Sequence, residues 1–151
     1  ANEKDIDLLF CWANDPIVRH NSFNSKNISY ESHSKWFYEK LHDQFVKMYI
    51  LMLENVPVGQ VRIEIKNKSA LINYSISEQY RGQGLGSELI SKIEEEIKAK
   101  YNEVEELIAL VKEDNITSRK VFLKNSFLET CENDSGMLVY KYSKRLKNYL
   151  A

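Results

Sequence analysis

The chain has 151 residues, of which 43% are hydrophobic and 28% charged, a composition typical of one folded domain with a sizeable core. Its 21 Lys and Arg residues nearly balance 22 Asp and Glu residues, so we expect neither a nucleic-acid partner nor binding to a membrane. No apolar run reaches the roughly 18 residues that a membrane helix needs. Cys11 and Cys131 form no motif, which favours a cytoplasmic location.

Helical spacing marks the first third of the chain. The apolar residues of the opening segment recur at positions i, i+3, i+4 and i+7: Ile6, Leu9, Phe10 and Ala13. The letters NDP at 14–16 end this helix, and Ser29 is the expected N-cap of a second helix over 30–41. Because the chain begins directly in a helical pattern, the loss of a first strand before Ala1 is left open.

The middle and end of the chain alternate between strand and helix patterns. Residues 48–54 are apolar on both parities, which predicts a strand buried on both faces, whereas 60–65 alternate between apolar and polar side chains. The later elements are a strand at 71–77, a helix from 85 to 97, a strand at 106–111, a helix at 115–125 and strands at 127–131 and 137–142. This α-α-β-β-β-α-β-α-β-β order predicts an α+β fold with a mixed sheet flanked by helices.

Three glycines at alternate positions follow an arginine in RGQGLG, residues 81–86. The spacing does not fit a dinucleotide fingerprint, and no lysine follows where a phosphate-binding P-loop needs one. What remains is a run of backbone N–H groups at a helix start, unobstructed by Cβ atoms, which can bind an anion such as a diphosphate. A tight turn without a ligand is the alternative interpretation.

At these residues the chain resembles the GNAT superfamily of acyl-CoA-dependent N-acyltransferases. RGQGLG fits its signature of Gln or Arg, two residues, Gly, one residue, and Gly or Ala. NITSRKVFLKNSF, residues 115–127, resembles the second marker of the superfamily at the expected separation. The resemblance implies a single domain over 1–151, a mostly antiparallel central sheet, and acetyl-CoA as the acyl donor.

The resemblance also implies which residues contact CoA. The pyrophosphate would bind the backbone of the glycine segment, the pantetheine arm would pair with the third strand, and the following helix would contact the arm. The residues concerned are Tyr74, Ser75, Ile76, Arg81, Gly82, Gln83, Gly84, Leu85, Gly86, Ser87, Asn115, Ser118 and Phe122. No metal is expected, since His20, His33 and His42 have no partners at metal-ligand spacing.

Two positions depart from the family pattern. Phe122 stands where many members have a tyrosine that protonates the leaving CoA thiolate, and Ser126 replaces the usual glycine before Phe127. The proton donor is therefore another group, with Tyr74 or Tyr140 as candidates, or water, or it is dispensable because a thiolate is already a tolerable leaving group.

The attacking amine must be neutral, so a base is expected near the acetyl group. Glu64 is the first candidate because it lies on the polar parity of its strand, although pairing with a lysine or Arg62 would explain it equally well. His33 is the second candidate, and a packing role in its helix is the alternative.

The acceptor is inferred from the first third of the chain. This region resembles bacterial enzymes that acetylate nucleotide-linked amino-deoxysugars, and the expected acceptor-binding residues are Arg19, Asn21, Ser22, His33 and Trp36. We expect Arg19 to pair with a phosphate and Trp36 to stack on a sugar or base. Acetylation of a protein N-terminus, of the ribosomal-protein type, and a catalytically inactive CoA-binding module are the alternatives; a homodimer is expected by analogy alone.

Overall fold

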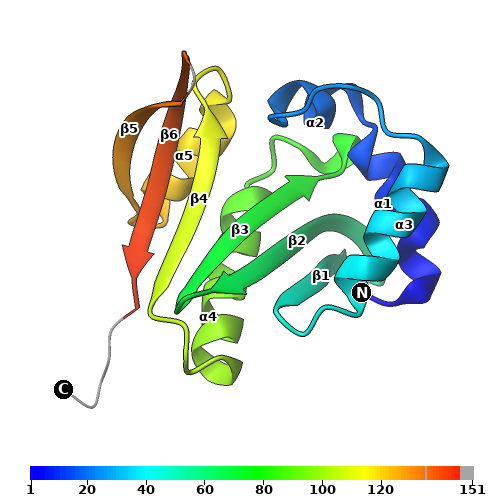
Figure 1. Cartoon of the computed structure of the whole chain (residues 1–151), viewed down its shortest axis with the longest axis horizontal. Coiled ribbons are helices and arrows are strands. Elements are labelled where there is room, and N and C mark those ends of the chain that lie inside the picture. Colours follow the sequence, from blue (N-terminus) through cyan, green and yellow to red (C-terminus); the bar gives the residue numbers. More distant parts are fainter. Residues whose placement is uncertain (135, 147–151) are drawn as a thin grey trace.

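The computed structural model describes residues 1–134 and 136–146, so residues 135 and 147–151 of the predicted domain lie outside the described part. Its strands are β1 (Val46–Leu53), β2 (Val56–Lys66), β3 (Ser69–Ile76), β4 (Glu106–Lys112), β5 (Leu128–Asp134) and β6 (Met137–Arg145). They form one sheet in the order β1-β2-β3-β4-β6-β5, in which only β3 and β4 pair in parallel (Figure 1). The predicted α+β fold with a mixed sheet is confirmed.

The helices are α1 (Ile6–Ala13), α2 (Pro16–Asn21), α3 (Tyr30–Leu41), α4 (Leu85–Lys100) and α5 (Ile116–Lys124), with short 3₁₀ turns η1 (Glu3–Asp5) and η2 (Glu78–Tyr80). The sequence analysis missed α2. Asp15 caps it by accepting from the amide of Ile17, and Pro16 occupies the first helical position, where its missing N–H costs nothing. No helix of the described residues is long and apolar enough to cross a membrane.

Helices cover the sheet on both faces (Figure 1). α4 lies behind β2 and β3 and α5 behind β4 and β6, while α1 and α3 lie against the other face near β1. The alternation predicted for 60–65 explains this arrangement: Val61 and Ile63 are fully buried in the α4 side, with Ile90 and Ile97 of that helix packed in the same core. The polar parity of β2 faces α3.

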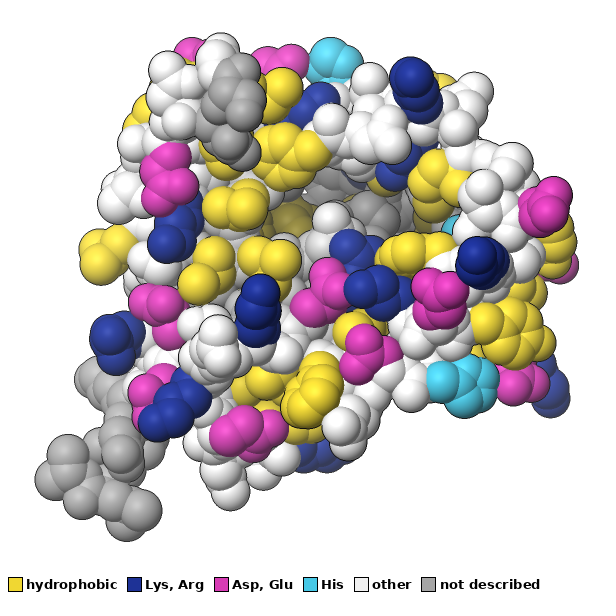
Figure 2. Space-filling view, viewed as in Figure 1, with side chains coloured by type: hydrophobic (Ala, Val, Ile, Leu, Met, Phe, Trp, Pro, Cys, Tyr) yellow, Lys and Arg dark blue, Asp and Glu magenta, His cyan; other side chains and the backbone are white. Residues whose placement is uncertain are grey.

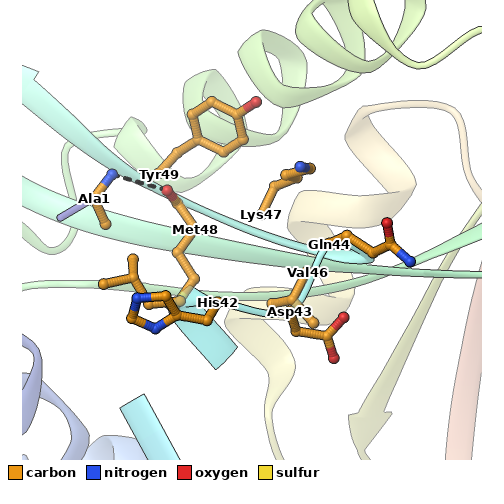
Figure 3. Close-up of a pocket in the computed structure, with 9 residues that line it drawn as sticks. Ala1, His42, Asp43, Gln44, Val46, Lys47, Met48 and Tyr49 are labelled. Atoms are coloured by element: carbon orange, nitrogen blue, oxygen red, sulfur yellow. Dashed lines mark hydrogen bonds between the residues drawn. The ribbon is translucent and has the colours of Figure 1, made fainter. Parts of the chain in front are cut away.

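β1 lies at the edge of the sheet, and the prediction that it is buried on both faces is wrong, because all its residues after Val46 are half-buried or exposed. Its end is exposed, with 52% of Met52 and 42% of Leu53 accessible. A cavity of about 340 Å³ lies beside β1, where the amine of Ala1 donates to the carbonyl of Met48 at 2.9 Å (Figure 3). None of the predicted site residues lines this cavity.

The feature that positions the functional site is a split in the sheet. β3 and β4 pair over three residues only, Ser69–Leu71 with Glu106–Ile108, and then diverge (Figure 1). Beyond this point, Tyr74–Ile76 still pair with β2 on one side but have no strand partner on the β4 side. Their backbone groups on that side are therefore available to an extended ligand.

Candidate functional site

A cavity of about 970 Å³ occupies the split between β3 and β4. Figure 2 shows the corresponding face of the molecule hollowed between the two halves of the sheet. The cavity is continuous from the glycine segment and α5 on one side to α1, α2 and α3 on the other. It therefore brings the predicted CoA residues and the predicted acceptor residues into one space.

The glycine segment has the conformation expected of an anion-binding loop. Gly82 and Gly84 have φ of +79° and +78°, in the left-handed region that favours glycine, and a Cβ at either position would meet nothing within 4 Å. Gly84 is the N-cap of the 16-residue α4, and no side chain caps this helix end. The first amides of α4 thus face the cavity at the positive end of the helix dipole.

Gly86 differs from Gly82 and Gly84 in its backbone conformation. It has no left-handed φ, and a Cβ built on it would lie 3.4 Å from Cε2 of Tyr74 and 3.5 Å from Cγ2 of Val121. These are ordinary contact distances, so α4, β3 and α5 leave room for a Cβ at this position. Only two of the three alternating glycines are therefore required by the loop conformation, and the third lies in close but unstrained packing.

Helix α2 bridges the two sides of the split. At its start, Nη2 of Arg81 lies 3.1 Å from Oδ2 of Asp15. At its end, Nε2 of His20 lies 2.9 Å from Oδ2 of Asp114, and Nζ of Lys112 donates to the carbonyl of His20 at 2.8 Å. The helix that the sequence analysis missed therefore ties the acceptor side to the glycine segment and to the end of β4.

Arg81 itself is occupied by protein groups. Its Nε donates to the carbonyl of Ile76 at 3.0 Å, and its terminal nitrogen binds Asp15. Burial alone would raise the pKa of Asp15, but hydrogen bonds from Arg81 and from the amides of Ile17 and Val18 outweigh it and hold this pKa below its usual value. At position 81 the side chain thus orients the loop, and the backbone amide donates to the carbonyl of Glu78, so the amides that remain for an anion are those that follow Arg81.

Two hydroxyl groups meet beside the predicted CoA arm. Tyr74 Oη lies 2.8 Å from Oγ of Ser118, and both residues line the cavity. Burial raises the pKa of Tyr74, so the phenol keeps its proton. Asn115 caps α5 by accepting from the amide of Ser118 at 3.3 Å, and the ring of Phe122 packs edge-on against Tyr74. The site thus holds hydroxyl protons next to the phenylalanine that replaces the family tyrosine.

The remaining candidates lie apart from this pair. Tyr140, the other candidate proton donor, does not line the cavity, and its ring is covered by the guanidinium of Arg119 at 3.7 Å. Ser126 has φ of +69°, which explains why the family pattern has glycine there.

His33 lies in the cavity wall and is almost fully buried, with 2% of its surface exposed. Its Nε2 lies 3.2 Å from the carbonyl of Ile6, and because a carbonyl only accepts, Nε2 carries the proton and Nδ1 holds the lone pair. Burial lowers the pKa of His33, opposed by the Ile6 carbonyl and the charge of Asp7, so the imidazole is neutral near pH 7.

Glu64 is held by two cations. Its Oε1 lies 2.6 Å from Nζ of Lys40 and its Oε2 lies 3.5 Å from Nε of Arg62. Burial would raise the pKa of Glu64, but these cations outweigh it and lower the pKa, which weakens the carboxylate as a base. Glu64 is also not among the residues that line the cavity. This geometry does not support the preference for Glu64 over His33.

Arg19, Asn21, Ser22 and Trp36 all line the cavity, as expected of acceptor-binding residues. The guanidinium of Arg19, however, already donates to the backbone carbonyls of Ala13, Asn24 and Lys26 and to the hydroxyl of Ser22. Arg19 therefore closes the loop after α2, and few of its N–H groups are left for the predicted pairing with a phosphate.

Sequence reasoning missed the charge of the cavity wall and with it Arg62. The described residues that line the cavity include no Asp or Glu but five cationic residues: Arg19, Arg62, Arg81, Lys120 and Lys124. The alternation of β2 indicated a polar face, but only the tertiary structure shows that this face borders the cavity. No group of three or more His, Cys, Asp or Glu among the described residues is placed to hold a metal ion.

Comparisons with known proteins agree with this architecture. The ribosomal-protein-serine acetyltransferase of Escherichia coli (strain K12) is 32% identical over 103 residues, which are 65% of this chain and 57% of that protein. The chain thus matches little more than half the length of this curated relative.

Two solved structures show the fold. A ribosomal L7/L12 alpha-N-protein acetyltransferase in complex with coenzyme A has a TM-score of 0.83 at 20% identity, covering 97% of this chain and 91% of that one. An aminoglycoside acetyltransferase in complex with coenzyme A and kanamycin has a TM-score of 0.82 at 16% identity, covering 96% and 91%. The model of the acetyltransferase (GNAT) family matches residues 12–127. Because this match spans most of the chain, the chain belongs to this family.

Proposed function

We propose that this chain transfers the acetyl group of acetyl-CoA to a primary amine. The observation that carries the proposal is the shared cavity, which joins the open N-terminus of α4 to the unpaired edge of β3. A diphosphate suits the amides that follow Gly82 and Gly84, and an extended arm suits the free edge at Tyr74–Ile76. These are the two parts of CoA that precede its thioester.

The chemistry is a direct transfer. The amine lone pair attacks the thioester carbon, the new C–N bond forms as the C–S bond breaks, and the thiolate leaves. We assign the proton that the thiolate takes up to the linked hydroxyls of Tyr74 and Ser118, which lie 2.8 Å apart in the cavity lining. The proton lost by the amine goes to water or to Nδ1 of His33, which is the neutral imidazole of the cavity wall.

The cationic wall assists the same reaction. The described lining of the cavity has no carboxylate. An acceptor ammonium group would therefore lie beside Arg62 and other cations without a counter-charge, which favours the neutral amine. The wall therefore lowers the pKa of a bound acceptor amine toward the form that attacks. It also makes a polycationic acceptor of the aminoglycoside type a poor fit, although the fold is shared with a kanamycin-bound enzyme.

The acceptor that we favour is a nucleotide-linked amino-deoxysugar. Trp36 offers an aromatic ring to a sugar or base, and Asn21 and Ser22 offer polar groups for hydroxyls. The second candidate is the N-terminal amine of a protein, which the 32% identity to the ribosomal-protein-serine acetyltransferase favours.

The test is CoA-thiol release by the purified protein with acetyl-CoA and three sets of acceptors. The sets are UDP- and CMP-linked 4-amino sugars, peptides with an N-terminal serine, and kanamycin. Turnover with nucleotide sugars supports the proposal, and turnover with peptides alone would replace it by the second candidate. Calorimetric binding of acetyl-CoA without turnover of any acceptor would indicate an inactive CoA-binding module instead.

A further inference from the structure

Arg62 lines the cavity, and the proposed acetyl transfer gives its positive charge no anionic partner. It projects from the face of β2 that borders the cavity, opposite Asn73 of β3. Its guanidinium carbon lies 5.0 Å from the centre of the Trp36 ring, and 22% of the side chain is exposed. The aromatic ring holds the guanidinium in place without neutralising it.

The charges around Arg62 do not balance. The single carboxylate in contact, that of Glu64, forms its short ion pair with Lys40 at 2.6 Å, whereas Nε of Arg62 lies 3.5 Å away and is buried without a hydrogen-bond partner. Two cations thus share one carboxylate, and the described lining of the cavity provides no second acid. A half-buried cation with a surplus of charge favours an anionic ligand.

The other two arginines of the cavity are engaged elsewhere. Arg19 donates to three backbone carbonyls and a hydroxyl. Arg81 binds Asp15 and the carbonyl of Ile76 and keeps one buried nitrogen, Nη1, without a partner, but it belongs to the glycine segment on the CoA side. The two lysines, Lys120 and Lys124, lie on α5, at the side of the cavity that would hold CoA. Arg62 is therefore the cation of the acceptor side that has the most hydrogen-bonding capacity left.

This inference rests on the proposed function. We propose that Arg62, held by Trp36, binds an oxyanion of the acceptor and makes the enzyme selective for amines that carry an acidic group. A guanidinium binds a phosphate or a carboxylate through two parallel hydrogen bonds. With a nucleotide-linked sugar, the group bound is a phosphate of the nucleotide. With a peptide acceptor, it would be the carboxylate of an acidic side chain close to the reacting terminus.

The experiment compares acceptor pairs in which one member lacks the anion; because the sugar pair also loses the nucleoside, the Arg62 variants below separate the two contributions. One pair is a UDP-linked 4-amino sugar and the same amino sugar without UDP; the other is two peptides beginning Ser-Asp or Ser-Asn. We expect the wild type to prefer the acidic member of its productive pair by roughly ten- to a hundredfold in kcat/KM, the range of a charge-assisted hydrogen bond. Which pair shows the preference distinguishes a phosphate from a carboxylate.

Arg62→Met keeps the length of the side chain and its contact with Trp36 but removes the charge, and we expect it to bring the preference to about one. Lys66→Met is the matched control, since Lys66 lies on the same strand but does not line the cavity, and it should retain the preference. Thermal unfolding and calorimetric CoA affinity verify that each variant is folded. If Arg62→Met does not fold, Arg62→Lys and the wild-type ratio still test the proposal.

The outcomes separate this inference from the proposed function. Equal kcat/KM for acidic and neutral acceptors in the wild type, or an equal loss of the preference in Arg62→Met and Lys66→Met, would overturn the role of Arg62 and leave acetyl transfer standing. Absence of turnover with every acceptor would overturn the proposed function. In that case, calorimetric titration of wild type and Arg62→Met with the UDP-linked amino sugar still decides whether Arg62 binds the anion.

Discussion

Replacing Gly84 by alanine tests the anion-binding loop at its most demanding position. Gly84 has φ of +78° and ψ of 7°, where an L-residue costs about 1–2 kcal/mol relative to glycine. For a chain of this length, 1 kcal/mol lowers Tm by about 2–4 °C, so we expect Gly84→Ala to lower Tm by about 2–8 °C. If the loop relaxes toward negative φ instead, the amides turn away from the cavity, and CoA affinity falls at least about tenfold.

Gly86→Ala is the matched control for this substitution, two residues further along the same segment. Its φ is not left-handed, and the new Cβ would meet Tyr74 at 3.4 Å, an ordinary contact distance. We therefore expect unchanged CoA affinity and an equal or higher Tm, because alanine is the better helix former. Circular dichroism melts and calorimetric titration with CoA give both numbers. An unchanged Tm together with unchanged CoA affinity in Gly84→Ala, or an equal loss in Gly86→Ala, would refute the reasoning.

Three further predictions follow from the contacts around the cavity. Tyr74→Phe removes the hydroxyl that is hydrogen-bonded to Ser118 and should lower kcat roughly ten- to a hundredfold. Phe122→Tyr should change kcat less than about tenfold. A much larger increase of kcat in Phe122→Tyr would mean that a missing acid limits the enzyme. Burial lowers the pKa of His33 in the folded chain, so the unfolded chain binds a proton more readily. The free energy of unfolding, measured by urea titration, should therefore fall as pH drops below about 6.5. His33→Gln should make this fall smaller. Ser126→Gly relieves a left-handed φ of +69° and should raise Tm by a few degrees; an unchanged or lower Tm would contradict that reading of the position.

Local patterns were sufficient for most of the fold. Ser29 does cap α3, the 60–65 alternation does bury Val61 and Ile63, and the repeat from Leu85 to Ile97 does form the buried face of α4. These features were predictable because capping and side-chain period are set by neighbours in the chain. Helix α2 has the same kind of signal, Asp15 before Pro16, but the same letters also mark the end of α1, so the sequence does not separate the two helices.

The roles of the glycines could be predicted only in part. Gly82 and Gly84 have the left-handed φ that an anion-binding loop suggests, but Gly86 has no such φ and packs near Tyr74 of β3, twelve residues earlier. Similarly, the edge position of β1 could not be deduced from its apolar residues, since a hydrophobic run does not reveal how many neighbouring strands the sheet provides.

The order of the strands and longer helices, the mixed sheet, the glycine loop at the start of α4 and the family markers could all be predicted without the structure, because each depends on residues close together in the chain. Which charges face the cavity depends on the tertiary structure. In the folded chain Glu64 forms its short ion pair with Lys40, Arg19 donates to backbone carbonyls, and Arg62 lies beside Trp36 with surplus charge. Such partners lie on different elements, and their distances are set when helices and strands pack, so no local pattern specifies them.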